Sequence, residues 1–334
     1  MRFAFTQDQL DFSGAVSDLL AKECSPDALR AAWAGDDGRV AGLWDRLVEM
    51  GVVGLLAPES AGGFGLAEVD LVRIAYEAGR VALPEPLSSV AGVVVPALRD
   101  HGGDRGASLL EELVGGSAAV ALGLAVNPLV QHSAGATGFL LEADDGLHLV
   151  PAADVSLTSE ESVDGSRRPA RVAWSPSAAT LLDDPVLAAA EANARAAVFT
   201  AAELCGLADT MLGLTTGYVA ERKQFGVPIG SFQAIKHHCA DAMLAVEFAK
   251  PLVWRAAYSL SVGDPAAAVH ASMAKSSASD AADVVGRIAM QCHGGIGYTT
   301  EYDLHLYLKR AWALVAQDGS AAAHRRKVAD AVLS

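Results

Sequence analysis

The sequence predicts a mostly α-helical fold with a small β domain at its centre. Helical periodicity dominates both ends of the 334-residue chain, and hairpin and strand signals are confined to its middle. Hydrophobic residues make up 51% of the chain and charged residues 19%, a composition too apolar for a disordered protein. We therefore expect three segments: a helical domain over 1–115, a β domain over 116–182 and a helical bundle over 183–334.

The N-terminal segment carries start and stop signals for helices. Thr6 stands three residues before Gln9, a capping-box pattern that predicts a helix beginning near Gln7. Residues 41–50 and about 67–79 place apolar side chains at helical spacing, and glycine or proline follows each stretch. These patterns predict at least three helices before residue 116.

The middle segment reads as strands. Residues 138–141 and 147–150 are apolar runs that flank Asp-Asp-Gly, which is a strong hairpin signal. Residues 172–174 suggest one more strand. The segment is long enough for a modest sheet only.

Four long helical stretches with short connections predict an antiparallel bundle at the C-terminal end. Asp264 and Pro265 fit the N-cap and first position of the third helix. Pro251 is expected to kink the second helix. The stretches run over about 185–221, from about 231 to beyond 243, over 265–293 and over about 301–315.

Charge and composition exclude several classes of protein. The formal net charge of −15 repels phosphate backbones, so we expect no nucleic-acid partner. The longest apolar run, Val90–Leu98, is about half of what a membrane span needs, and no signal peptide is visible. Cys24, Cys205, Cys239 and Cys292 show no paired spacing, which is typical of reduced thiols in a cytoplasmic protein.

Two C-terminal motifs and one N-terminal motif are specific enough to indicate a family. Residues 221–233 read Glu-Arg-Lys-Gln-Phe-Gly-Val-Pro-Ile-Gly-Ser-Phe-Gln, and residues 291–301 read Gln-Cys-His-Gly-Gly-Ile-Gly-Tyr-Thr-Thr-Glu. Near the start, Leu-Ala-Pro-Glu at 56–59 precedes Gly-Gly-Phe-Gly at 62–65. In this order, the three motifs resemble those of the flavin-dependent acyl-CoA dehydrogenases. The resemblance covers nearly the whole chain and implies a reduced β-barrel-like middle domain followed by a four-helix bundle.

The chemistry of these residues suits a flavin dinucleotide. The planar guanidinium of Arg222 matches phosphate oxygens, and Phe225 offers an aromatic face for an adenine ring. Gly294 and Gly295 have no side chains, so a cofactor can approach their backbone closely. Taken singly, each is also explained by a helix end or a helix C-cap.

The resemblance assigns this set a shared role. In the family, the matching residues reach across a subunit interface to the adenosine-diphosphate part of FAD, which is held mainly by the neighbour. It therefore implies an oligomer whose FAD is contacted by Arg222, Phe225, Gln233, Gln291, Gly294 and Gly295. No G-x-G-x-x-G unit or P-loop is present.

Two positions depart from the family pattern. The Thr-Glu-Pro stretch that packs against the flavin ring in the family has no match between 118 and 184. The family's Tyr-Glu-Gly-Thr segment, whose Glu is the base, corresponds to Gln-Asp-Gly-Ser at 317–320. Asp318 is thus the candidate catalytic base, one methylene shorter than Glu, or else a turn residue that caps a helix beginning near Ala321.

Other candidates have simpler explanations. Glu203 lies on the helix where some family members place the base, but its register does not match, so we expect a packing or helix-surface role. His237 and His238 precede Asp241, yet no second cluster completes a metal site.

The resemblance implies a specific kind of enzyme subunit. The chain is similar to the short subunit of actinobacterial α2β2 acyl-CoA dehydrogenases that act on steroid side chains. Its partners would be a full-length dehydrogenase subunit, an acyl-CoA substrate and an electron-transfer flavoprotein or similar acceptor. Two alternatives remain: a self-sufficient homotetramer with Asp318 as base, and a flavin-free structural subunit.

Overall fold

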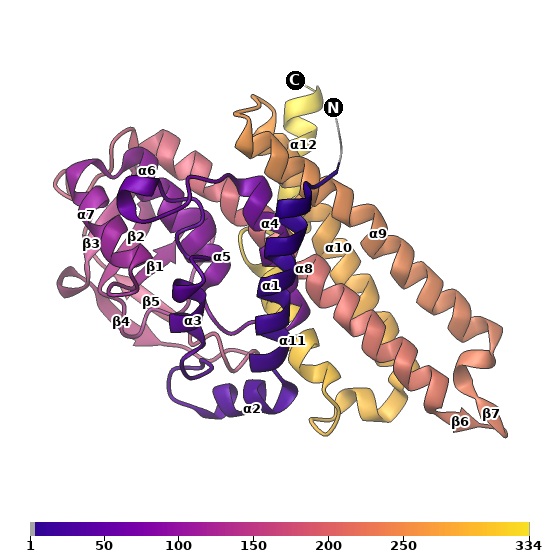
Figure 1. Ribbon diagram of the computed structural model, residues 1–334. Helices are drawn as coiled ribbons and strands as arrows, with labels where there is room; N and C mark the ends of the chain where they lie inside the picture. The colour runs from indigo at the N-terminus through magenta and orange to yellow at the C-terminus, as the bar shows by residue number, and fades with distance from the viewer. Residues whose placement is uncertain (1–3, 334) are drawn as a thin grey trace.

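A computed structural model describes residues 4–333, and Figure 1 shows long helices packed beside a small group of strands. The predicted capping box at Thr6 is present: its hydroxyl accepts a hydrogen bond from the Gln9 N–H at 3.3 Å, and the Gln9 side chain accepts one from the Thr6 N–H at 2.8 Å. The N-terminal helices and helical turns are α1 (Gln7–Glu23), α2 (Pro26–Ala34), α3 (Leu43–Glu49), η1 (Glu59–Ala61), α4 (Glu68–Arg80), α5 (Leu87–Ser89), η2 (Val90–Val94), α6 (Val95–His101) and α7 (Gly103–Val114).

The middle of the chain forms short strands. β2 and β3 make the predicted hairpin, with Gly138 opposite Pro151, and β1 pairs in parallel with β2. β4 and β5 form a separate antiparallel pair. Within residues 4–333 these strands do not close into a barrel. The middle of the chain therefore holds only small, open sheets, as expected for a reduced β domain. The elements are β1 (Val120–Gly123), β2 (Gly138–Ala143), β3 (Gly146–Pro151), η3 (Ala152–Asp154), β4 (Ser156–Ser159) and β5 (Ala170–Ala173).

The C-terminal helices form the predicted bundle, in which α8, α9 and α10 pack along one another (Figure 1). The expected start of the third helix at Pro265 is two residues early, because the Asp264 carboxylate accepts from the Ala266 N–H at 2.9 Å in a turn before the helix. The second helix continues through Pro251. The elements are α8 (Pro185–Glu221), β6 (Lys223–Gln224), β7 (Val227–Pro228), η4 (Ile229–Ser231), α9 (Gln233–Ser261), α10 (Ala267–His293), η5 (Gly294–Tyr298), α11 (Leu304–Ala316) and α12 (Ala321–Leu333).

Helices α4 and α8 cross at a pair of glycines. A Cβ atom on Gly206 would lie 2.0 Å from the Tyr76 carbonyl oxygen, and one on Gly79 would lie 2.1 Å from the carbonyl oxygen of Glu203. Only glycine permits this approach of the two backbones. The crossing joins the N-terminal helices to the bundle, and one hydrophobic core includes residues of both.

Helix α8 is the central helix of the fold. Its length and apolar composition alone would allow it to cross a membrane, which the uninterrupted apolar runs of the sequence did not predict. However, 67% of its most apolar window is buried inside the protein. Its apolar character is therefore explained by the core that it forms.

The four cysteines are unpaired, as predicted. Cys24, Cys205 and Cys292 are buried, and Cys239 is half-buried. Burial raises the pKa of Cys24 and of Cys205 to about 12. Their thiols therefore stay protonated and behave as small apolar groups.

Candidate functional site

A cavity of about 80 Å³ lies beside α8, and we name it the α8 cavity. Its walls come from α5 and η2, from β1 and the loop that follows it, from α8, and from the end of α11 with the turn at 317–318. Segments far apart in the sequence therefore meet at one enclosed space.

One face of α8 lines this cavity. Ala196, Phe199, Thr200 and Glu203 stand at spacings of three, four and seven residues, so they share one side of the helix. Glu203 had been expected to have a packing or helix-surface role, and the structure instead places it on the cavity wall. Its register could not be read from the sequence because it depends on how α8 is held against α4 and α6.

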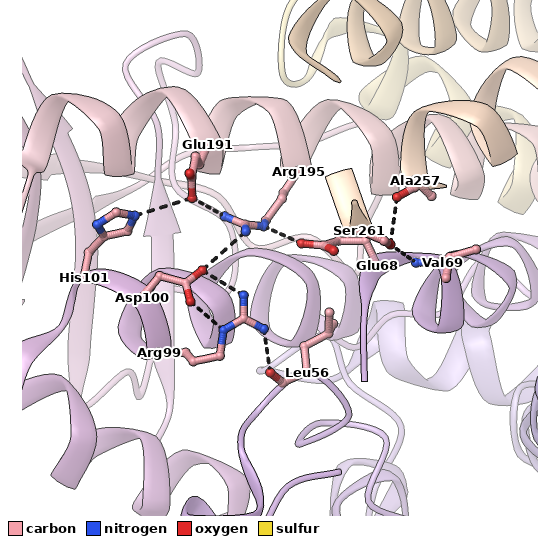
Figure 2. Close-up of polar contacts among 10 residues, drawn as sticks. All are labelled: Leu56, Glu68, Val69, Arg99, Asp100, His101, Glu191, Arg195, Ala257 and Ser261. Carbon is pink, nitrogen blue, oxygen red and sulfur yellow. Dashed lines mark hydrogen bonds and ion pairs between the residues drawn. The ribbon is translucent and has the colours of Figure 1, made fainter. Parts of the chain in front are cut away.

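A neighbouring face of α8 is held by an ionic cluster around the buried Arg195 (Figure 2). Arg195 donates to Glu68 of α4 at 2.8 Å and to Glu191 at 2.9 Å, and its guanidinium lies 3.4 Å from the carboxylate of Asp100 at the end of α6. Figure 2 shows Arg99 completing the cluster by pairing with Asp100. Because the Arg195 guanidinium is engaged by these carboxylates, it is not available to bind a ligand in the α8 cavity.

Asp318 lies on the cavity wall in a strained turn. Its φ angle is 56°, in the left-handed region, and Gly319 follows at 98°. One carboxylate oxygen accepts from the Thr200 hydroxyl at 2.6 Å and the other from the Asn127 amide at 2.8 Å. The Asp318 N–H in turn donates to the Asn127 side-chain oxygen at 2.7 Å. Both carboxylate oxygens of Asp318 thus already accept a hydrogen bond. To remove a proton from a substrate carbon, Asp318 would have to give up one of these hydrogen bonds.

Hydrogen bonds from Lys275 and His324 fix the backbone of the turn at Asp318. The fully buried Lys275 ammonium donates to the Gly319 carbonyl oxygen at 3.1 Å and to that of Val315 at 3.3 Å, and a ring nitrogen of His324 lies 2.7 Å from the Asp318 carbonyl oxygen. Burial lowers the pKa of Lys275 to about 8, and the Asp318 charge opposes the shift. The helix that follows begins at Ala321 as expected, but its cap is Ser320 rather than Asp318.

Two further carboxyl groups face the α8 cavity. Burial raises the pKa of Glu85 to about 7, although its neighbour Arg39 opposes the shift. Burial also raises the pKa of Glu203. Glu85 was not singled out from the sequence, although an acid between Pro84 and Pro86 in an apolar stretch was a usable signal.

A buried ion pair closes one side of the cavity. Arg310 of α11 pairs with Asp164, and its guanidinium also donates to the Leu83 carbonyl oxygen and to the Ser166 hydroxyl, both at 2.5 Å. Burial alone would raise the pKa of Asp164, but Arg310 and Arg167 lower it. The Arg310–Asp164 ion pair therefore holds the loop around Asp164 against helix α11.

The six residues predicted to contact FAD lie outside this cavity. They are exposed where α8 and α10 end and α9 begins, and Figure 1 shows this end of the bundle carrying the β6–β7 hairpin. Tyr218 stacks on His293 with ring centroids 4.5 Å apart, which places the ends of α8 and α10 together. We name this set the bundle-end surface: Arg222, Phe225, Gln233, Gln291, Gly294 and Gly295.

The bundle-end surface has features that fit the adenosine-diphosphate part of FAD. The Arg222 guanidinium has no hydrogen-bond or ion-pair partner among the described residues, and the Phe225 side chain is 93% exposed. Gly294 has a φ of 63°, and no atom lies within 4 Å of the Cβ position of Gly294 or Gly295. A free guanidinium, an exposed ring and an open backbone suit a pyrophosphate and an adenine.

The bundle-end surface and the α8 cavity are far apart. Arg222 follows Glu203 by nineteen residues along α8, which corresponds to about 28 Å at 1.5 Å per residue. One dinucleotide bound by this chain alone would have to span that distance. Among the described residues, no cluster of His, Cys, Asp and Glu could hold a metal ion.

Comparison with known proteins gives consistent matches. Residues 6–117 match the family model "Acyl-CoA dehydrogenase, N-terminal domain", and residues 188–333 match "Acyl-CoA dehydrogenase, C-terminal domain". The acyl-CoA dehydrogenase IpdE2 of Mycobacterium tuberculosis is 35% identical, over 89% of this chain and 88% of its own length.

Solved structures agree with the fold. A variant of the Tcur3481-Tcur3483 steroid ACAD superposes with a TM-score of 0.88 and 25% identity, covering 98% of both chains. The ChsE4-ChsE5 complex from Mycobacterium tuberculosis gives a TM-score of 0.89 at 23% identity, covering 100% of this chain and 99% of that one.

Proposed function

The chain belongs to the acyl-CoA dehydrogenase family, and from that premise we propose that it is the short subunit of a heteromeric, FAD-dependent acyl-CoA dehydrogenase. The reaction is α,β-dehydrogenation of an acyl-CoA thioester. The chain contributes its bundle-end surface to an FAD whose ring rests on a full-length partner, in an α2β2 assembly.

The observation that carries this proposal is the separation of the two sites. The bundle-end surface is exposed and ready to contact a dinucleotide, yet it lies about 28 Å along α8 from the α8 cavity of the same chain. A surface so placed suits a cofactor that belongs to a neighbouring subunit.

The reduced middle domain supports a flavin ring held elsewhere. No Thr-Glu-Pro stretch follows β1. Instead, Asn127 of the loop after β1 forms two hydrogen bonds with Asp318. The loop in the position that would face a flavin ring is therefore already hydrogen-bonded, through Asn127, to Asp318 on the other side of the α8 cavity.

The residues have distinct roles in this proposal. Bound FAD would accept the hydride that leaves the β-carbon of the substrate. Arg222 binds the pyrophosphate, Phe225 faces the adenine, and the backbone at Gly294 and Gly295 lets the cofactor approach. The amides of Gln233 and Gln291 supply hydrogen bonds to the same part of the cofactor.

The substrate class and the partners follow from the relatives. Two of the similar structures are described by paired subunits, and one of these is described as a steroid ACAD. We extend both features to this chain and propose that the substrate is the CoA ester of a steroid side chain. Electrons would pass to an electron-transfer flavoprotein or a similar acceptor, and free cysteines agree with a cytoplasmic location.

A second candidate is a self-sufficient homotetramer with Asp318 as the base. The position of Asp318 on the cavity wall favours it, because a base must reach the α-carbon of a bound thioester. The hydrogen bonds from Thr200 and Asn127 weigh against it, since proton transfer would require Asp318 to exchange one of them.

Flavin content separates these proposals. The chain is purified alone and co-expressed with a full-length dehydrogenase subunit of the same genome, and absorbance is recorded at about 450 nm, where oxidised flavin absorbs. We expect flavin only in the complex. Flavin bound by this chain alone would favour the homotetramer, and its absence from both preparations would indicate a structural subunit.

A further inference from the structure

Two of the four cysteines, Cys239 of α9 and Cys292 of α10, lie close together near the bundle-end surface. Their helices pack along one another and are joined by the short connection at 262–266, so they run in opposite directions. A hydrogen bond of 2.9 Å between the Ser259 hydroxyl and a ring nitrogen of His270 links the two helices near this connection. This bond shows which residues of α9 and α10 lie at the same level.

Both cysteines lie at nearly the same distance from that hydrogen bond. Cys239 precedes Ser259 by twenty residues, which is about 30 Å along α9 at 1.5 Å per residue. Cys292 follows His270 by twenty-two residues, which is about 33 Å along α10. Because the helices run in opposite directions, both distances lead to the same end of the pair. The two thiols meet there, and a hydrogen bond joins them.

The two thiols differ in exposure and in basicity. Cys292 is only 4% exposed, whereas Cys239 is half-buried and within reach of a small oxidant. Burial raises the pKa of Cys292 to about 11, and its neighbour Cys239 adds to the rise. Burial also raises the pKa of Cys239, but the hydrogen bond from Cys292 opposes this rise because it stabilises the thiolate. Cys239 is therefore the thiol that reacts first, and Cys292 lies ready to react with it.

The other two cysteines are not arranged in this way. Cys24 is 3% exposed and Cys205 is fully buried. The groups that act on their thiols are carboxylates and cations, and no second thiol is among them in the described part of the chain. Cys24 and Cys205 are therefore internal references for thiols that stay reduced.

We propose that Cys239 and Cys292 are a reversible oxidation site, at which a hydroperoxide converts the two thiols into a disulfide that links α9 to α10. The Cys239 sulfur attacks the peroxide, the O–O bond breaks, and a sulfenic acid and an alcohol form, or water in the case of hydrogen peroxide. The Cys292 sulfur then attacks the Cys239 sulfur, the S–O bond breaks, and the hydroxyl group leaves as water with the Cys292 proton. The thiols lose two electrons, which the peroxide gains.

The proposed site is independent of flavin binding by this chain. It also agrees with a cytoplasmic location, because disulfides in that compartment are usually transient and redox-sensing. Since both pKa values are raised, little thiolate is present at neutral pH. We therefore expect the reaction to be slow and to require a sustained supply of oxidant.

Peptide mapping of the purified full chain tests the proposal. The reduced chain is treated with hydrogen peroxide, its remaining thiols are blocked with iodoacetamide in urea, and its tryptic peptides are analysed by mass spectrometry. We expect peptides 237–255 and 288–309 to be joined, two hydrogen atoms lighter than their sum, and to be separated by dithiothreitol. The link closes a loop of more than fifty residues, so oxidation should also raise the urea midpoint of unfolding by about 1 M.

Three variants provide the controls. Cys239→Ala and Cys292→Ala should each abolish the joined peptides and the shift of the urea midpoint. In Cys292→Ala, the sulfenic acid on Cys239 should accumulate and react with dimedone, because the second thiol is absent. Cys24→Ala removes a buried thiol from outside the pair and should retain both the link and the shift.

Two kinds of result would overturn the proposal. One is the loss of thiols without joined peptides, which would show that the two sulfur atoms cannot reach each other. The other is a link that involves Cys24 or Cys205 or that joins two separate chains, which would show that the pair on α9 and α10 is not the preferred site.

Discussion

The buried ion pair between Arg310 and Asp164 is the interaction whose loss we expect to destabilise this fold most clearly. Asp164 is fully buried and Arg310 is only 6% exposed. Replacing Arg310 with Met keeps the unbranched stem of the side chain but removes the guanidinium, so the Asp164 carboxylate loses its main counter-charge. Breaking a buried pair from one side typically costs about 3–5 kcal/mol, and we expect about 3 kcal/mol because Arg167 still faces Asp164.

An exposed pair on α12 gives the control for this change. Arg325 lies 2.6 Å from Asp280, but the two side chains are 55% and 57% exposed. Arg325→Met removes the same charge, and such pairs contribute about 0–1 kcal/mol.

Urea unfolding followed by tryptophan fluorescence gives the free energy of unfolding of each variant. In a double-mutant cycle, Asp164→Asn combined with Arg310→Met should show a coupling of about 2 kcal/mol. The reasoning would be refuted if Arg310→Met lowered the free energy of unfolding no more than Arg325→Met does.

Three further predictions concern the α8 cavity and the bundle-end surface. Burial raises the pKa of Glu85 from 4.5 to about 7, so between these values the folded protein holds a proton that the unfolded chain has lost. Relative to Glu85→Gln, the wild type should therefore lose up to about 3 kcal/mol of stability as the pH rises through this window, and parallel stability profiles in urea would contradict this. Asp318→Asn, which the left-handed backbone accommodates, should lower turnover of the complex less than about tenfold, whereas loss of a true base would lower it by about a hundredfold or more. Phe225→Ala should leave the free energy of unfolding of the isolated chain within about 0.5 kcal/mol because the ring is exposed, and a larger loss would show that the ring supports the fold.

Local signals in the sequence predicted most of the elements. The Thr6–Gln9 capping box and the Asp-Asp-Gly hairpin are present as expected, because each depends on residues a few positions apart. Asp264 and Pro265 show the limit of such signals: the pair matches a helix start, but the side chain of Asp264 forms a turn instead.

The bundle-end surface could also be proposed from the sequence, since its residues belong to two contiguous motifs. The structure brings the motifs to one end of the bundle because α8 and α10 end together there. Their contact with FAD stays a prediction.

The α8 cavity could not be predicted in the same way. The orientation of Glu203 depends on contacts between Arg195 and residues 127 and 95 positions away in the sequence. Arg310 and Asp164 are separated by 146 positions. Periodicity within one helix carries no information on such long-range contacts, so the walls of the cavity and the position of Glu203 on them became visible only in the assembled fold.

The flavin content of a complex that carries Arg222→Met in this chain alone tests the central claim most directly. The partner remains wild type, and co-purification verifies that the complex still forms. The account predicts that absorbance at about 450 nm falls several-fold, because one subunit has lost the guanidinium that binds the pyrophosphate. Flavin content equal to that of the wild-type complex would contradict the claim that this chain shares in binding the partner's FAD.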